Sequence, residues 1–154
     1  MTDNVSSSQV SGSTVAENIA LVSRIGNEIW NKGDMPVCDA VFSADYIGHL
    51  PGTPAPVCGP REFGQLVQLY RTAFPDVHLT IEDVFAVGDR VAMRWTSRGT
   101  NLGPMMGVPP TGRRIEIMGV SIFRIAQGKV VEEWEGFDTM ALMQQLGVMG
   151  APQS

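Results

Sequence analysis

The second half of the chain carries the feature that most constrains the fold: two long stretches in which β-branched and aromatic residues alternate with polar ones. The first, VHLTIEDVFAVGDRVAMRWTSRGT (77–100), is interrupted by Gly88-Asp89, a typical hairpin turn. The second, RRIEIMGVSIFRIAQGKVVEEWEGFD (113–138), is interrupted by Ala126-Gln127-Gly128. A Gly/Pro-rich loop, NLGPMMGVPPTG, separates them. These patterns predict about four long antiparallel strands.

Helical spacing of apolar residues dominates the first half. It predicts a helix from Val15 to Trp30, a short helix from Met35 to Phe42, and a third helix that stops at Pro75. A last short helix, TMALMQQLG, ends at Gly147. Because helices precede strands, we expect an α+β domain in which a curved antiparallel sheet wraps around the N-terminal helices.

Length and composition indicate one globular domain. The chain has 154 residues, of which 44% are apolar and 18% charged. We assign residues 15–149 to this domain. The polar, Ser-rich stretch 1–14 is predicted to be a disordered N-terminal tail, and 150–154 a short flexible C-terminal tail.

The charge pattern excludes two classes of partner. The net charge is −5 and no Lys/Arg cluster is present, so we expect no nucleic acid and no membrane as partner. No secretory signal and no membrane-spanning run is recognised. Two cysteines, Cys38 and Cys58, are too few for a disulfide framework, which favours reduced thiols in a cytoplasmic protein and leaves a single bridge between them open.

The second hairpin decides which side chains share a face of the sheet. A type I turn followed by a left-handed Gly128 predicts a bulge in which Gly128 and Lys129 together oppose Ile125. Trp134 and Asp138 then share one face. We expect that face to be the inner one, because it carries a nearly continuous apolar stripe: Met118, Val120, Ile122, Val130 and Trp134. The other face, with Phe123, Val131 and Phe137, is expected to be exposed or to join copies in a homodimer or higher homo-oligomer.

These residues carry a resemblance to a known family. FPD, the GxPPTG loop, the R…GK turn, and a Trp followed four residues later by Asp ahead of QLG together resemble the SnoaL-like polyketide cyclases. Their cone-shaped α+β fold is shared with ketosteroid isomerase and nuclear transport factor two. The resemblance implies a cone-shaped barrel with an internal pocket, intramolecular aldol ring closure of a small hydrophobic carbonyl substrate, and no metal or organic cofactor. It also implies that the carboxylate at Asp138 is the general base.

Ring closure of this kind requires a base in apolar surroundings and a hydrogen-bond donor that stabilises the developing enolate. Asp138 is the expected base, with His49 as a second catalytic residue, and Tyr46 and Arg124 as further candidate donors. The residues expected to contact substrate are Trp30, Tyr46, Trp95, Met105, Met118, Arg124 and Trp134.

Each of these roles has an alternative. Asp138 also fits the N-cap of the last helix, and His49 a surface loop histidine. The tryptophans also fit a core, Arg124 a surface pair with Glu132, and Met105 either a lid or a subunit contact. Three functions therefore stay open: a proton-transfer enzyme of the cyclase or ketosteroid isomerase kind, an epoxide-hydrolase-like enzyme using Arg124, Glu132 and Asp138, and a non-catalytic small-molecule-binding domain.

Overall fold

The structure is a computed structural model that describes residues 13–105 and 107–149. Apart from Ser13 and Thr14, the two predicted tails lie outside the described residues. The helices are α1 (Val15–Arg24), the π-helix η1 (Ile25–Trp30), α2 (Val37–Val41), α3 (Gly59–Ala73) and α4 (Thr139–Leu146). The strands are β1 (Phe42–His49), β2 (Val57–Cys58), β3 (His78–Val87), β4 (Arg90–Thr100), β5 (Arg114–Ala126) and β6 (Lys129–Phe137).

The helices begin and end close to where the sequence predicts. Thr14 caps α1 by accepting a hydrogen bond from the Glu17 backbone amide, and the same helical run continues through η1 to Trp30. Gly147, at φ 79°, ends α4 in the left-handed conformation. The second helix is shorter than predicted, because Phe42 already begins β1.

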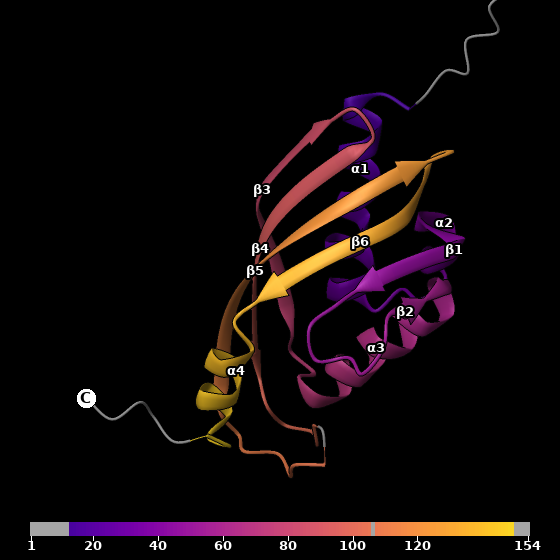
Figure 1. Ribbon diagram of the computed structural model, residues 1–154. Helices are drawn as coiled ribbons and strands as arrows, with labels where there is room; N and C mark the ends of the chain where they lie inside the picture. The colour runs from indigo at the N-terminus through magenta and orange to yellow at the C-terminus, as the bar shows by residue number, and fades with distance from the viewer. Residues whose placement is uncertain (1–12, 106, 150–154) are drawn as a thin grey trace, which may run out of the picture.

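One curved, open sheet holds all six strands, in the order β2-β1-β6-β5-β4-β3. Figure 1 shows α1, α2 and α3 on one side of this sheet and α4 beyond the end of β6. The predicted α+β class is confirmed, with one difference: β1 runs parallel to β6. A parallel pair requires a long crossover, and here the intervening chain includes α3, β3, β4 and β5. Within the described residues, no helix is long and apolar enough to cross a membrane.

The β5–β6 hairpin has a different turn from the one predicted. Gln127 (φ 52°) and Gly128 (φ 73°) are both left-handed, which makes a two-residue turn between the paired residues Ala126 and Lys129. The register shifts later, between Arg124 and Ile125, and Ile122 lies opposite Trp134. The bulge predicted at Gly128 would instead place Ile122 opposite Glu132. The predicted register is therefore wrong by two residues. Beyond the shift, an even error leaves the grouping of side chains by face unchanged. Before it, Val130 pairs with the buried Ile125 and so lies on the other face from Trp134.

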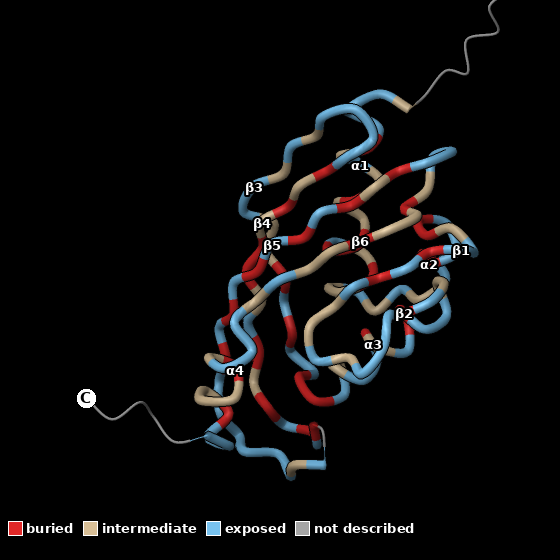
Figure 2. Tube along the Cα trace, viewed as in Figure 1, coloured by how far each residue is buried: buried red, intermediate tan, exposed pale blue. Residues whose placement is uncertain are grey.

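The prediction of which face is inner is wrong. Met118, Val120 and Ile122 are 56%, 45% and 43% exposed, whereas Ile117 and Phe123 are buried. Along β5 the alternation of buried and exposed residues is regular (Figure 2). Of the stripe predicted to face the core, Met118, Val120, Ile122 and Trp134 therefore lie on the outer face of the sheet, because the helices cover the opposite face. Val130 alone is buried in the core, as predicted.

Aromatic side chains join the helices to the inner face. The ring of Phe42 lies 4.4 Å from the ring of Tyr46 and 4.4 Å from that of Phe63 on α3. All three residues are almost fully buried. This cluster fixes β1 against α3 and so determines where the neighbouring strand β6 presents its inner side chains.

Candidate functional site

A cavity of about 740 Å³, counting the part of its mouth open to solvent, lies between the inner face of the sheet and the helices. One acidic side chain, Glu135, is among the described residues that line it. The other lining residues are mostly apolar: Trp30, Leu50, Pro51, Phe63, Leu66, Tyr70, Phe74, Val77, Leu79, Trp95, Ser97, Ile115, Ile117, Phe137 and Leu142.

Two elements shape the cavity. Gly119 on β5 lies opposite Trp95 on β4, and a Cβ at Gly119 would come within 2.2 Å of the indole, so glycine is needed for Trp95 to lie there. At the far end, Leu142 of α4 forms part of the cavity wall. Gln145 anchors α4 by bonding both backbone polar groups of Glu116, the amide at 2.7 Å and the carbonyl at 3.1 Å.

Glu135 is held by a short hydrogen-bond chain. The Trp95 indole N–H donates to the Ser121 hydroxyl at 3.1 Å, and that hydroxyl donates to a carboxylate oxygen of Glu135 at 3.2 Å. Ser121 is 1% exposed and lies directly opposite Glu135 in the sheet. The carboxylate that faces the cavity is therefore oriented by residues of β4 and β5.

A second carboxyl group, Glu133, lies two residues earlier on the same face of β6. Glu133 is 2% exposed, and the Tyr46 hydroxyl donates to one of its oxygens at 2.7 Å. A Cβ at Gly48 would lie 2.3 Å from the Tyr46 hydroxyl oxygen, so glycine leaves the room that this hydrogen bond needs. No ion pair to Glu133 or Glu135 is present among the described residues.

Both carboxyl groups favour their protonated form more than an ordinary glutamate does. Burial raises the pKa of Glu135 to about 7, against the opposing effect of the Ser121 hydrogen bond. Burial and the nearby charge of Glu135 raise the pKa of Glu133 to about 8. A base whose pKa lies near neutrality is suited to removing a proton from carbon at neutral pH.

Tyr70 supplies a hydrogen-bond donor to the cavity. Burial and the charge of Glu135 raise the pKa of its phenol, which therefore stays protonated. Its ring packs edge-on against Trp30 at 5.9 Å. Within the described residues the Tyr70 hydroxyl has no hydrogen-bond partner. It is therefore free to donate to a bound molecule.

Three of the predicted site residues lie on the inner side. Trp30 and Trp95 line the cavity, whereas Tyr46 is buried behind it and contacts Glu133 instead. Met105 is buried, but it lines a separate small pocket with Asn101, Val108, Thr111, Met143, Leu146 and Val148.

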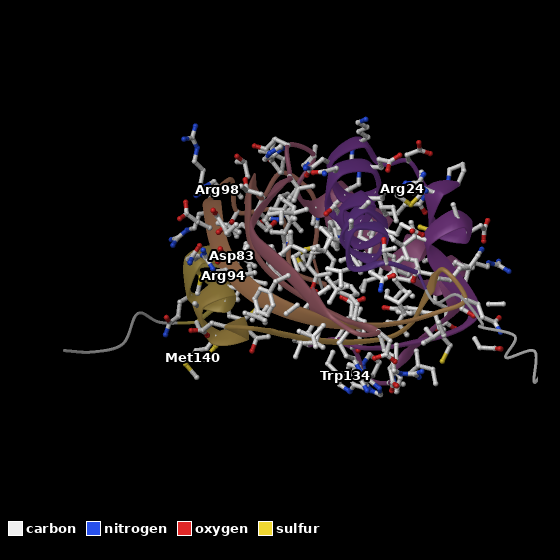
Figure 3. All side chains as sticks on the ribbon, turned by 90° about the horizontal axis from the view of Figure 1, so that it is seen from above. Arg24, Asp83, Arg94, Arg98, Trp134 and Met140 are labelled. Carbon is white, nitrogen blue, oxygen red and sulfur yellow. The ribbon has the colours of Figure 1, made fainter. Side chains whose placement is uncertain are left out.

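Four other predicted site residues lie on the outer face: His49, Met118, Arg124 and Trp134. His49 stacks on Trp134 with ring centres 5.7 Å apart and contacts Glu132 at 2.9 Å, and Arg124 contacts the same carboxylate at 3.2 Å. In Figure 3 Trp134 lies on the side of the sheet away from α1 and α2. The pairing of Arg124 with Glu132 is thus the alternative that the sequence left open. His49 also borders a shallow depression formed with the loop 50–56 and Glu135.

Asp138 does not reach the cavity, so its predicted inward position is wrong. It is exposed and follows the last residue of β6, and its side chain accepts a hydrogen bond from the Ala141 backbone amide at 2.9 Å. This is the N-cap alternative, in which the carboxylate stabilises the start of α4. Of the residues of the hydrolase alternative, Arg124 and Glu132 contact each other on the outer face, and Asp138 is engaged at the start of α4.

Reasoning from the sequence misses four residues of this site: Tyr70, Ser121, Glu133 and Glu135. Acidic residues are rarely buried, so the glutamates of VVEEWEGF are expected at the surface. The signal that could find them is the second stripe on β5, Ile115, Ile117, Phe123 and Ile125, which is as apolar as the stripe on the outer face.

Among the described residues, no cluster of three His, Cys, Asp or Glu side chains could hold a metal ion. Cys38 and Cys58 are free thiols.

Comparisons with known proteins agree with this architecture. The sequence profile of the family described as SnoaL-like polyketide cyclase matches residues 20–146. Nogalonic acid methyl ester cyclase of Streptomyces nogalater is 28% identical over 120 residues, which are 77% of this chain and 89% of the relative. Aklanonic acid methyl ester cyclase DnrD of Streptomyces peucetius is 27% identical over 123 residues, 78% of this chain and 84% of the relative.

A solved structure extends the likeness to three dimensions. AclR of Streptomyces galilaeus, provisionally described as a hydroxylase, superposes with a TM-score of 0.79 at 30% identity, over 92% of this chain and 87% of its own. The profile match covers most of the chain, and the two curated relatives are both cyclases. The chain therefore belongs to the SnoaL-like polyketide cyclase family and is an enzyme of the cyclase type.

Proposed function

We propose that this polyketide cyclase closes a ring in a polyketide ester by intramolecular aldol condensation, with Glu135 as the general base. The observation that carries the proposal is one carboxylate with a raised pKa in an otherwise apolar cavity. The substrate class follows from the two curated relatives, whose names describe methyl ester cyclases. A polycyclic aromatic ketone is hydrophobic and suits walls made of Trp30, Trp95 and Phe74.

The reaction needs one proton taken and one proton returned. The ionised Glu135 removes a proton from the substrate carbon between two carbonyl groups, and the resulting enolate carbon attacks a ketone carbonyl in the same molecule. A carbon–carbon bond forms and the carbonyl becomes an alkoxide. The proton on Glu135 then goes to that alkoxide. Atoms and electrons balance without an oxidant, a metal or an organic cofactor.

Tyr70 is proposed to stabilise the enolate. It lines the cavity together with Glu135, and its hydroxyl stays protonated because burial and the Glu135 charge raise its pKa. A preorganised donor in apolar surroundings stabilises developing negative charge strongly. The Ser121 hydroxyl, which bonds Glu135 at 3.2 Å, keeps the base oriented during the proton transfer.

The test compares Glu135→Gln with Asp138→Asn. We expect Glu135→Gln to lower kcat by about 100-fold or more, as loss of a general base does, while binding of a product analogue is retained. Asp138→Asn keeps the helix cap, since Asn and Asp cap equally well, and should leave kcat within about twofold. Stopped-flow absorbance of the aromatic substrate measures both. Loss of turnover in Asp138→Asn alone would reverse the assignment, and unchanged turnover in both variants would mean that neither carboxylate is the base. A wild-type protein that binds the product analogue but does not turn over substrate would be a binding domain.

We also propose that a second copy of this chain covers the outer face of the sheet. An apolar row there, Phe85, Ala92, Ile122 and Trp134, runs across β3, β4, β5 and β6. It is flanked by Arg94 with Asp83 at 2.7 Å and Arg124 with Glu132 at 3.2 Å, so both signs of charge border the row. Such a surface is complementary to itself under two-fold symmetry.

The cytoplasmic location predicted from the two cysteines stays a prediction.

A further inference from the structure

Ser97 is a polar residue of the cavity wall to which the proposed ring closure gives no role. It lies on β4, and the residues paired with it in the sheet are Leu79 on β3 and Ile117 on β5. All three residues line the cavity, and the two neighbours are buried and apolar. One hydroxyl group therefore interrupts a row of apolar side chains on the inner face of the sheet.

The Ser97 hydroxyl has no hydrogen-bond partner within the described residues. The residues of β4 whose side chains form hydrogen bonds there are Arg94, Trp95, Arg98 and Thr100. In the same part of the chain, no fully buried side-chain nitrogen or oxygen lacks a partner, so the Ser97 oxygen is open to the cavity rather than enclosed by protein. A hydroxyl group in apolar surroundings gains free energy when a bound molecule supplies the missing partner.

Ser97 lies far from the proposed base along the wall of the cavity. Glu135 on β6 pairs with Ser121 on β5, and Ser121 pairs with Met93 on β4, so these three residues form one row across the sheet. Ser97 lies on β4 beyond Met93, toward the end of that strand. With a rise of about 3.3 Å per residue and about 4.8 Å between strands, the Cα atoms of Ser97 and Glu135 are about 16 Å apart. A molecule that contacts both side chains must therefore be long.

An aromatic surface lies between these two polar positions. Trp95 is midway between Met93 and Ser97 on β4 and shares their face, and its ring packs edge-on against Phe137 with ring centres 6.1 Å apart. Both aromatic residues line the cavity, so fused rings can pack on them. A polyketide chain carries oxygen on alternate carbon atoms, and its fused rings therefore bear hydroxyl or carbonyl groups remote from the ring that is being closed.

We propose that Ser97 is a specificity-determining residue that hydrogen-bonds an oxygen substituent, a phenolic hydroxyl or a quinone carbonyl, on the substrate ring farthest from the carbon that Glu135 deprotonates. This inference rests on the proposed function, which puts the reacting carbon at Glu135. The Ser97 hydroxyl donates to a carbonyl oxygen, and it donates to or accepts from a phenol. A substrate with a methyl group at that position leaves the hydroxyl unpaired and binds less tightly.

Two symmetrical probes test this contact without any turnover. Anthraflavic acid is an anthraquinone with a hydroxyl group at each end of its fused rings, and the corresponding dimethyl anthraquinone has methyl groups of similar size there. The direction in which either probe binds therefore does not matter. Quenching of the fluorescence of Trp30 and Trp95 measures the dissociation constants. We expect Ser97→Ala to weaken binding of anthraflavic acid by about three- to tenfold, as loss of one hydrogen bond does, and to leave binding of the dimethyl probe within about twofold.

Thr80→Ala is the matched control for this experiment. Thr80 follows Leu79 on β3, so its side chain lies on the face of the sheet away from the cavity, and the variant should bind both probes as wild type does. Ser97→Cys keeps the size of the side chain but is a weak donor, and it should show the same selective loss should Ser97→Ala fold poorly. Equal effects on the two probes, no effect on either, or a wild type that binds neither would overturn the proposal.

The kinetics of ring closure give an independent readout. A contact at the remote ring is the same in the ground state and the transition state, so Ser97→Ala should raise KM by about three- to tenfold and leave kcat within about twofold. A fall in kcat at unchanged KM would contradict a role in specificity. If wild type turns over no polyketide ester, the proposed function fails, and the binding of the two probes still decides the role of Ser97.

Discussion

At the scale of single residues, adjacent glutamates on β6 are predicted to affect stability in opposite directions. Burial raises the pKa of Glu133, whereas hydrogen bonds from His49 and Arg124 lower that of Glu132 on the outer face. A raised carboxyl pKa means that the folded state binds more protons than the unfolded state between the two pKa values. The free energy of unfolding therefore falls as pH rises through that window.

We predict that Glu133→Gln removes this loss of stability. Relative to wild type, the variant should become progressively more stable as pH rises from about 5 to about 8, because folded wild type must release the extra proton that the raised pKa of Glu133 makes it bind. Urea unfolding at a series of pH values measures it. Glu132→Gln is the matched control, because it removes a lowered pKa and should lose stability above about pH 5. Parallel pH curves for the two variants would contradict the burial assigned to Glu133.

Single residues are also the least predictable level of the site. Trp30 and Trp95 are expected at the cavity and line it, but Asp138 is expected inside and instead caps α4. The sequence is compatible with Asp138 as a base in the cavity and as the N-cap of α4. The N-cap role depends only on local backbone geometry, whereas the base role depends on the packing of distant elements. Glu135 is missed because its burial depends on helices that are distant in sequence, and composition alone assigns a glutamate to the surface.

At the scale of elements, the approach of β4 to β5 sets the width of the cavity. Gly119→Ala places a methyl group against the Trp95 indole, where a Cβ would lie 2.2 Å from the ring. The indole must move, and Ser121, which it bonds, moves with it. We expect a loss of roughly 1–3 kcal/mol in stability, as for other overpacked sites, and a raised KM.

Gly136→Ala is the control for that substitution. Gly136 lies on β6 opposite Val120, and a Cβ there would meet no atom within 4 Å. Its stability should stay within about 0.5 kcal/mol of wild type, and its KM should not change. Thermal unfolding and steady-state kinetics compare the two variants. Equal effects would mean that strand propensity, not the indole, determines the result.

Elements are predicted well where their signals are local. The helical spacing of apolar residues predicts α1, η1 and α3, and Gly88-Asp89 predicts the turn between β3 and β4. The predicted β5–β6 register is wrong because the shift beyond Ile125 has no sequence marker, while Gly128 suggests a bulge at the turn itself. The predicted inner face is wrong because both stripes of β5 are apolar, and only the position of the helices separates them.

At the scale of the whole molecule, one substitution tests the proposed second copy on the outer face of the sheet. Ile122→Glu places a charge in the middle of the apolar row between Phe85 and Trp134. We predict that it weakens association by at least about tenfold, because an unpaired charge is costly to bury in an interface. Analytical ultracentrifugation over a range of concentrations measures the change.

Val148→Glu serves as the control for association, since Val148 is exposed beyond α4 and away from that row. It should leave the sedimentation profile unchanged. A wild-type protein that sediments as a monomer at every concentration would contradict a second copy on this face. Cavity turnover in Ile122→Glu should be retained, because the substitution lies on the other side of the sheet from Glu135.

The parallel pairing of β1 with β6 has a consequence for how the protein is made. Tyr46 and Glu133, which bond across these strands, are separated by 87 positions in the chain. During synthesis β1 leaves the ribosome early and has no partner in the sheet except the short β2 until β6 follows. Long-range pairing of this kind slows folding. The buried contact between Tyr46 and Glu133 is therefore assembled only after β6 has been made.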